Sequence, residues 1–283
     1  MDFNRPIKIQ TGTNTFLDIN SLAGVRVGAA PLSGFKVESA AYASVSAQGF
    51  VDKAALRDGA TVTEAYLGAR TIDILVSVYG ETMGDFWDKL DQLTAAMQPM
   101  PLDFSADFGV RSLRFFQPSW EMAADFPGGI ELDMLCRPAA LPTYNVGRRN
   151  SIGKESDGFS QPATLRFIAP NPKKFLITSK SLSTGTAEHR GSAAVYPILT
   201  KASCTTGDTV TFAWSGGGTS SQVQVTATAD GTVTVDTDTM QQTNCRVVHT
   251  NTNGDFLVYP GTVTINAGSN TTDATVTFTE AWL

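Results

Sequence analysis

The sequence predicts a mostly β protein with two domains: an N-terminal α+β domain with a sheet and one main helix, then a C-terminal antiparallel β-sandwich or jelly roll. An alternating strand runs directly into an amphipathic helix over residues 71–97. Residues 185–283 are rich in Thr and Val, whose branched side chains favour strands. A chain of 283 residues is also long enough to bury two cores.

The N-terminal domain is best defined at its strand–helix unit. In the strand over 71–79, Ile72, Ile74, Val76 and Val78 fall on one face because side chains alternate along a strand. A helix is expected over 83–97, with Thr82 as its N-cap and Asp85 at the capping-box position. We expect its apolar stripe to pack on the domain's own sheet. The stripe comprises Met83, Phe86, Trp87, Leu90, Leu93 and Met97.

The other N-terminal elements follow from short patterns and turn residues. Residues 35–50 are expected to be extended, 57–60 to form a turn and 61–67 a short strand. Pro99 and Pro101 end the helix. Later expectations are strand-like pieces around Phe104, Phe108, Leu113, Phe115 and Phe116, a turn at 125–129, strands over 130–136 and 163–169, and a polar loop over 143–160.

We place the first domain at residues 1–180 and the second at 181–283. Either the strand over 130–136 or the strand over 163–169 could close the first domain, so the boundary could be as early as residue 145. The two strands have similar alternation, and a proline follows each of them.

The second domain is predicted to contain about eight short strands separated by turn residues. Asp230-Gly231 predicts a two-residue hairpin, and residues 215–218 (SGGG) predict a long hairpin tip. The expected strands are 194–200, 209–214, 222–228, 231–236, 245–249, 255–259, 261–266 and 273–279.

Charge and hydropathy exclude several classes of protein. The chain has a formal net charge of −6, and residues 185–283 hold three basic and eight acidic side chains. Nucleic-acid binding needs basic density, so we expect no nucleic-acid specificity. No apolar run reaches the roughly 20 residues of a membrane span. The first ten residues lack a signal-peptide core, so assembly in the cytoplasm is expected.

The sequence offers no convincing catalytic, cofactor-binding or metal-binding residues, and we expect the protein not to be an enzyme. His189 and His249 are far apart and lack ligand spacing. Cys136, Cys204 and Cys245 have no CxxC spacing and are expected to be buried free thiols, with Cys204 and Cys245 possible neighbours in one sheet. No phosphate-binding or nucleophile motif is present.

A few residues keep carbohydrate chemistry open. Asp236 and Asp238 would share one strand face but are expected to be solvated. Trp214 and Tyr259 lie near turns, where an aromatic ring could stack on a sugar, although a core position is the favoured interpretation for Trp214. A carbohydrate-binding module therefore remains the alternative function, ahead of a glycosidase or peptidase.

The order of short motifs resembles the distal tail protein (Dit) family of siphophages. The resemblance covers most of residues 20–283, with an apparent insertion at 143–160. Its motifs are GARTI (68–72), VSVYGET (76–82), FWDKLDQLTAAMQP (86–99), LRF (113–115), LRF (165–167) with PNP (170–172), GSAAVYPI (191–198), TVTVDT (232–237), LVYPG (257–261) and AWL (281–283).

The resemblance implies a structural virion protein at the distal end of a long non-contractile phage tail. Such proteins form a hexameric ring through their N-terminal domains and join the tail tube protein to the tail-tip or baseplate hub. The second domain would be a galectin-like sandwich at the periphery, where receptor-binding or side-fibre proteins could dock. Contact with the tape-measure protein is also implied, and no cofactor is.

Overall fold

The chain folds as two compact units, Met1–Pro172 and Lys173–Leu283. The division falls eight residues before the boundary expected at residue 180. The computed structural model describes residues 3–26, 31–43, 47–53, 60–99, 109–118, 126–144, 153–155, 158–252, 256–267 and 273–283. The turn expected at 57–60 falls largely outside these ranges, as do Phe104, Phe108 and Asp125.

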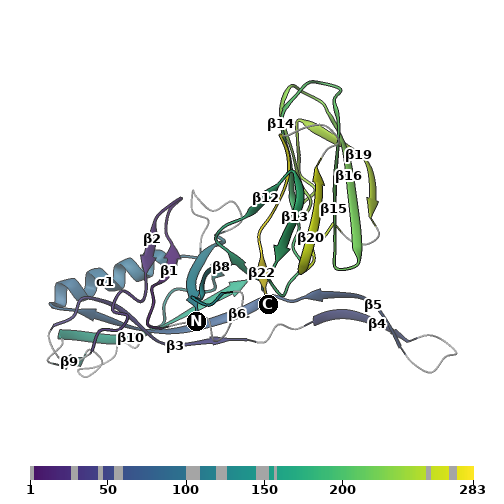
Figure 1. Cartoon of the computed structure of the whole chain (residues 1–283). Helices are drawn as coiled ribbons and strands as arrows, with labels where there is room; N and C mark the ends of the chain where they lie inside the picture. Colours follow the sequence, from purple (N-terminus) through teal and green to yellow (C-terminus); the bar gives the residue numbers. More distant parts are fainter. Residues whose placement is uncertain are drawn as a thin grey trace. The chain divides into compact units, whose positions relative to one another are not determined.

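The first unit is built on an antiparallel sheet (Figure 1). The strand order is β2-β1-β7-β8-β10-β6-β3, with β9 paired to β10, while β4 and β5 pair separately with each other. The elements are β1 (Ile7–Gln10), β2 (Phe16–Asp18), β3 (Gly34–Tyr42), β4 (Ala47–Lys53), β5 (Ala60–Leu67), β6 (Arg70–Gly80), α1 (Met83–Ala96), β7 (Arg111–Gln117), β8 (Ile130–Pro138), β9 (Gly153–Glu155) and β10 (Gly158–Ala169).

Strand β6 lies between β10 and the edge strand β3 and confirms the predicted strand over 71–79. It pairs with β10 over eleven residue pairs, from Phe159 opposite Gly80 to Ala169 opposite Arg70, and with β3 on its other side. Ile72, Ile74, Val76 and Val78 are all buried, as their alternation predicted. The strand expected over 61–67 is also present, as β5.

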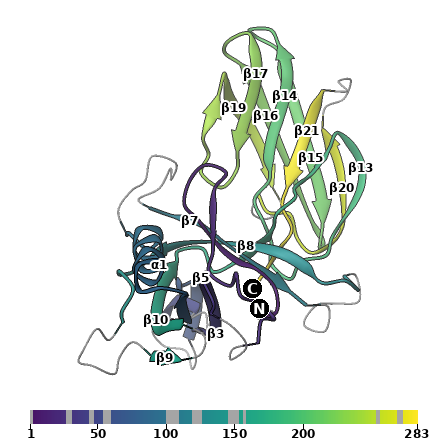
Figure 2. The ribbon, with the colours of Figure 1, turned by 90° about the vertical axis from the view of Figure 1, so that its left-hand side faces the viewer.

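Helix α1 lies across one face of this sheet (Figure 2) and packs mainly on β6. Thr82 is its N-cap, and its hydroxyl accepts a hydrogen bond from the Asp85 N–H at 3.1 Å. Four of the six predicted stripe residues are buried: Phe86, Leu90, Leu93 and Met97. The predicted apolar stripe included two residues too many, because Met83 and Trp87 are 40% and 41% exposed.

The predicted loop over 143–160 is wrong at its end. Strand β10 begins at Gly158, five residues before the predicted start, and the short strand β9 pairs with it. The polar and Gly-rich composition concealed these strands because they lack apolar alternation. Gly158 adopts a φ of +99°, and a Cβ there would lie 2.5 Å from the Gly80 oxygen, so the close approach to β6 requires glycine.

The second unit is an antiparallel β-sandwich of two five-stranded sheets, and a short pair, β11–β22, lies beside them. The sheet orders are β12-β21-β14-β17-β18 and β13-β20-β15-β16-β19. The strands are β11 (Lys174–Leu176), β12 (Lys180–Leu182), β13 (Thr184–His189), β14 (Ile198–Cys204), β15 (Thr209–Gly216), β16 (Thr219–Ala227), β17 (Gly231–Asp236), β18 (Gln242–Thr243), β19 (Cys245–Thr252), β20 (Gly261–Ala267), β21 (Ala274–Phe278) and β22 (Ala281–Trp282).

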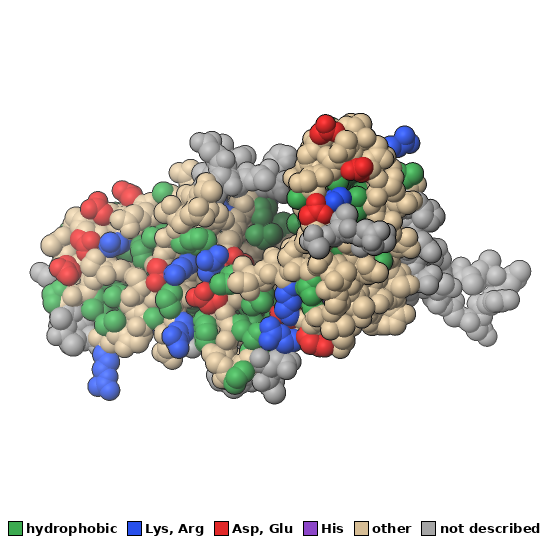
Figure 3. Space-filling model, turned by 45° about the horizontal axis from the view of Figure 1, so that its top comes forward, with side chains coloured by type: hydrophobic (Ala, Val, Ile, Leu, Met, Phe, Trp, Pro, Cys, Tyr) green, Lys and Arg blue, Asp and Glu red, His purple; other side chains and the backbone are tan. Residues whose placement is uncertain are grey.

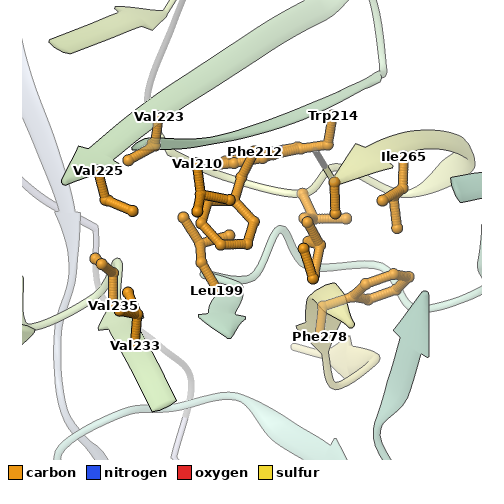
Figure 4. Close-up of a cluster of buried hydrophobic side chains, with 14 of the residues drawn as sticks. Leu199, Val210, Phe212, Trp214, Val223, Val225, Val233, Val235, Ile265 and Phe278 are labelled. Carbon is orange, nitrogen blue, oxygen red and sulfur yellow. The ribbon is translucent and has the colours of Figure 1, made fainter. Parts of the chain in front are cut away.

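Apolar side chains from both sheets meet in the sandwich core (Figure 4). Phe212 on β15 and Leu199 on β14 are fully buried, and the valines of β16 and β17 surround them. The alternation along each strand places these residues inward and the Thr and Gln residues outward. The predicted fold class is therefore confirmed: mostly β, with one helix in the first unit and a sandwich in the second.

The turns of the sandwich were predicted with mixed success. Residues 215–218 form the predicted hairpin tip, since Gly216 pairs with Thr219 and both Gly217 and Gly218 have positive φ. The two-residue hairpin at Asp230-Gly231 is wrong. Strand β16 belongs to one sheet and β17 to the other, so this connection crosses between sheets, and Gly231 is the first residue of β17.

Two predicted strands of the second unit are also corrected. The strand expected over 194–200 begins at Ile198 as β14, while Ala193 and Val195 form single bridges. In the segment 255–259, the described residues contribute only a single bridge, at Val258. Strands β11, β12, β13, β18 and β22 were not predicted. Among the described residues, no helix is long and apolar enough to cross a bilayer.

Candidate assembly surfaces

The structure does not bring the candidate chemical residues together into a reaction site. His189 is buried at the end of β13, and the side chain of His249 lies outside what the structure describes. Asp236 ends β17, whereas Asp238 is in the following turn, so the expected shared strand face is wrong. The Asp236 carboxylate instead accepts the Asp238 N–H at 2.9 Å and shapes that turn.

The three cysteines are buried free thiols, as predicted. Cys204 and Cys245 lie in different sheets of the sandwich, which corrects the idea that they are neighbours in one sheet. Burial raises the pKa of both thiols, and it raises the pKa of Cys136 beyond the range in which a thiolate forms. Within the described ranges, no group of three or more His, Cys, Asp or Glu side chains could hold a metal ion.

Trp214 takes the favoured core position. Its ring is buried in the sandwich, and its indole N–H donates to the Leu257 carbonyl at 3.2 Å. A ring held in this way cannot stack on a sugar at the surface. A hollow of about 270 Å³ does lie along β15, β16 and β20, and its polar side chains are uncharged: Ser215, Ser220, Ser221, Gln222, Thr264 and Asn266.

In the first unit, the end of α1 is bound by an arginine that no sequence pattern singled out. Arg111, on β7, is 1% exposed, and its guanidinium donates to the Ala96 and Gln98 carbonyls at 2.6 Å each. These carbonyls belong to the helix C-terminus, where a cation is favoured, and the last turn of α1 contains no basic residue of its own. Burial lowers the pKa of Arg111, but the group stays charged in this position.

Gly80 sets the distance between β6 and α1. A Cβ at this position would lie 2.3 Å from the Phe86 nitrogen, so any larger residue would displace the helix. The Asp85 carboxylate accepts the Glu81 N–H at 2.9 Å, one residue before the N-cap that a capping box would use. The Gly-Glu-Thr sequence therefore combines a close contact with a helix start.

The outer edge of β3 is partly covered by the preceding segment of the chain. The side-chain oxygen Oδ1 of Asn20 accepts the Val37 N–H at 2.9 Å, and the Ser21 hydroxyl accepts the Phe35 N–H at 3.0 Å. The Leu22 N–H donates to the Phe35 carbonyl. These bonds satisfy the first half of the edge strand, which would otherwise offer a template for another strand.

The β4–β5 hairpin of the first unit is left without a further strand partner in the described part of the chain. It continues the β3–β6 ladder beyond the sheet, because Tyr42 pairs with Ile72 and Ala47 then pairs with Leu67 (Figure 1). In the described part of the chain, β4 and β5 pair with no other strand. An isolated two-stranded hairpin is only marginally stable in water, so a partner surface would be needed to hold this one.

The described surface offers little support for a polyanion partner. On the face shown in Figure 3, basic and acidic side chains are interspersed. Two arginines on strands are already paired with aspartates, Arg114 with Asp133 and Arg166 with Asp73, at 2.8 Å and 2.7 Å. These pairs agree with the net negative charge in disfavouring nucleic-acid binding.

No protein-family model matches the chain, and no curated protein matches it in sequence. Among solved structures, the Dit protein of phage SPP1, described as a paradigm of the hub adsorption apparatus in phages that infect Gram-positive bacteria, matches with a TM-score of 0.54 at 18% identity. The match covers 88% of this chain and 94% of that chain.

Two structures of the phage p2 baseplate in its activated conformation, one with Sr and one with Ca, match with a TM-score of 0.47 at 9% identity, and each match covers 97% of both chains. The SPP1 match confirms at the level of fold the resemblance inferred from the sequence: this chain has the fold of the SPP1 Dit protein.

Proposed function

We propose that the chain is a structural protein at the distal end of a phage tail and that it acts without catalysis. The shared fold with a phage hub adsorption protein supports this role, because the match extends over both units. The observation that carries the proposal is the β4–β5 hairpin, which lacks a strand partner among the described residues. A structural role in an assembly would supply this hairpin with a partner surface from another chain.

The finer proposal is a hexameric ring formed by the first units. A closed cyclic assembly would supply each hairpin with a neighbouring copy and leave no open edge. Residues 1–60 have no clear core pattern in the sequence, which makes them a candidate source of inter-subunit strands or of the belt of the ring. Strands β1 and β3 instead pair within their own sheet, so the proposed contribution of this region narrows to β4 and its partner β5.

The ring would join the tail tube protein to the tail-tip hub of a long non-contractile tail, with the tape-measure protein as a further contact. The second unit would lie at the periphery, where receptor-binding or side-fibre proteins dock. Its compact sandwich suits a spacer or docking module. The protein would be assembled in the host cytoplasm and function in the virion.

The first test is the native mass of the purified chain, measured by mass photometry at several concentrations. Six copies of 30.1 kDa give about 181 kDa, and a ring of that mass should show a central hole in negative stain. If the chain alone is a monomer, it should form the ring when mixed with the tube protein and the hub protein of the same tail. A monomer under both conditions would overturn the proposal.

A further inference from the structure

The base of the second unit contains a buried ionic cluster around Glu280. The Glu280 side chain is fully buried and accepts hydrogen bonds from Lys180 Nζ at 2.9 Å, from the Arg190 backbone N–H at 2.6 Å and from the Arg190 guanidinium at 3.2 Å. Burial acts to raise the pKa of Glu280, but these bonds to Arg190 and Lys180 lower it overall. The carboxylate therefore ties both cations to the C-terminal strand segment.

His189 lies beside this cluster in a defined protonation state. Its side chain is 1% exposed, and its ring packs against Phe278 with the ring centres 5.8 Å apart. The Gly191 N–H donates to His189 Nδ1 at 3.1 Å. A backbone N–H can only donate, so Nδ1 has no proton, and the imidazole is neutral with its proton on Nε2.

The hydrogen bond from Gly191 to His189 matters for the structure because Gly191 lies in a tightly packed turn. A Cβ at Gly191 would lie 2.0 Å from the Ala281 oxygen, so the turn after β13 is in direct contact with β22. Two residues later, the Ala193 N–H donates to the same Ala281 oxygen at 3.0 Å. The hydrogen bond to His189 thus fixes a turn that has no room to move without releasing the C-terminal strand.

A proton on Nδ1 would break this arrangement. Nδ1 would become a donor facing a donor, and the Gly191 N–H would lose its acceptor in a buried position, which is costly. The charged groups that act on His189 are Glu280, Lys180 and Lys173. Burial lowers the pKa of His189, the attraction of Glu280 and a hydrogen bond with the Ala193 backbone raise it, and Lys180 and Lys173 lower it further. The overall shift is downward.

The remaining charged groups at this place are already engaged. Arg190 is bound to Glu280, Lys180 also donates to the Glu188 carbonyl, and the Glu188 carboxylate accepts the Thr262 hydroxyl at 2.6 Å. Glu280 is therefore the one described carboxylate whose attraction acts on the ring of His189. Its two ion pairs in the described part of the chain, with Lys180 and Arg190, already compensate its charge.

We propose that His189 is an acid-sensitive latch, which holds the turn 189–193 against the C-terminal strand β22 when neutral and releases both when protonated. The device acts within the second unit and does not depend on the proposed ring. Because the folded state favours neutral imidazole, the stabilisation is complete above the unfolded pKa of about 6.5 and is lost as the pH falls below it.

The test follows amide hydrogen exchange in the full-length chain at pH 7.5 and pH 5.5, corrected for intrinsic exchange rates. For the amides of residues 189–193 and 281–283, the equilibrium constant for opening should be higher at pH 5.5 than at pH 7.5 by a factor of about three or more. His189→Asn keeps an acceptor oxygen near the Nδ1 position without a titrating ring, so it should abolish the change. His249→Asn removes the other histidine by the same substitution and should preserve it.

Two results would overturn the latch. One is an equal acid response in His189→Asn, and the other is no acid response in the wild-type chain. NMR of the histidine ring nitrogens supplies an independent check that needs no variant. At pH 7.5, His189 should carry its proton on Nε2 and should titrate below pH 6.5, whereas a proton on Nδ1 would contradict the mechanism.

Discussion

The two units differ in how far their strand edges are protected from pairing with another strand. In the second unit, the end strands β12 and β18 have only three and two residues. At edge strand β19, the Val247 N–H donates to the Gln242 side chain. At edge strand β13, the Lys180 side chain donates to the Glu188 carbonyl. In the first unit, only the first half of β3 is covered, and the β4–β5 hairpin has no further strand partner in the described ranges.

This difference is the reason for proposing that assembly occurs through the first unit. Short strands, bulges and side-chain caps are the means by which proteins prevent unwanted strand pairing. The sandwich uses all of them, including a bulge in β19, where Val248 is the extra residue. The β4–β5 hairpin also contains a bulge, but its strands have seven and eight residues and pair with no further strand in the described ranges, so we propose that another chain covers it. Each of the following predictions tests this contrast between the second unit, whose strand edges are protected, and the first unit, whose hairpin has no further strand partner among the described residues.

The largest effect is expected from Phe212→Ala, which removes a fully buried ring from the sandwich core. We expect the second unit to lose about 4 kcal/mol of unfolding free energy. Differential scanning calorimetry should show one transition falling while the transition of the first unit stays in place. Equal shifts of both transitions would mean that the units fold as one and that the contrast is wrong.

Arg111→Met is expected to destabilise the first unit by about 3 kcal/mol, because two carbonyls at the end of α1 lose their donors in a buried place. Arg166→Met is the matched control. It removes an arginine of the same unit whose pair with Asp73 is exposed, and its effect should be too small to resolve. Urea unfolding followed by tryptophan fluorescence measures both, and equal losses would contradict the role of Arg111 as a helix cap.

Gly80→Ala should cost about 2 kcal/mol, since the new methyl group would overlap the backbone of Phe86 and push α1 away from β6. Gly84→Ala is a control in the same helix, where the nearest atom to a new Cβ is 3.9 Å away. That substitution should raise stability by up to about 1 kcal/mol through helix propensity. Thermal melts that rank the two variants the other way would exclude the close-packing argument.

The smallest effect is expected for Thr82→Ala, which removes the N-cap oxygen from the Asp85 N–H and should cost about 1 kcal/mol. Thr82→Ser retains a hydroxyl and should recover most of this loss. Circular dichroism melts of the two variants provide the comparison. If serine and alanine are equally unstable, the hydroxyl is not the source of the effect.

The sequence predicted those elements whose own residues carry a periodic pattern. Strand β6 and helix α1 were found because burial on one face requires apolar residues at intervals of two or of three to four. Strand β13 was missed because its sequence, TGTAEH, lies mostly exposed at a sheet edge and has no such pattern. The turn at Asp230-Gly231 was misread because local residues do not determine which sheet the next strand joins.

The candidate surfaces were less accessible to sequence reasoning than the fold. The sequence pattern could not show that Asn20 covers β3 or that β4 and β5 extend beyond the sheet. Arg111 is distant in sequence from the carbonyls it binds. Such contacts depend on which segments the fold brings together, and no local spacing encodes them.

The most direct test of the central claim compares native masses with and without the hairpin. Replacing residues 44–70 with Asn-Gly should close β3 and β6 with a short turn, since Ala43 already bonds to the Thr71 carbonyl at the end of their ladder. Val248→Lys, at a residue 59% exposed on β19, is the control in the second unit.

Mass photometry, alone and with the tube and hub proteins, should give about 181 kDa for the wild-type chain and for Val248→Lys, and a folded monomer for the hairpin variant. A hairpin variant that still assembles into a ring of six would contradict the account.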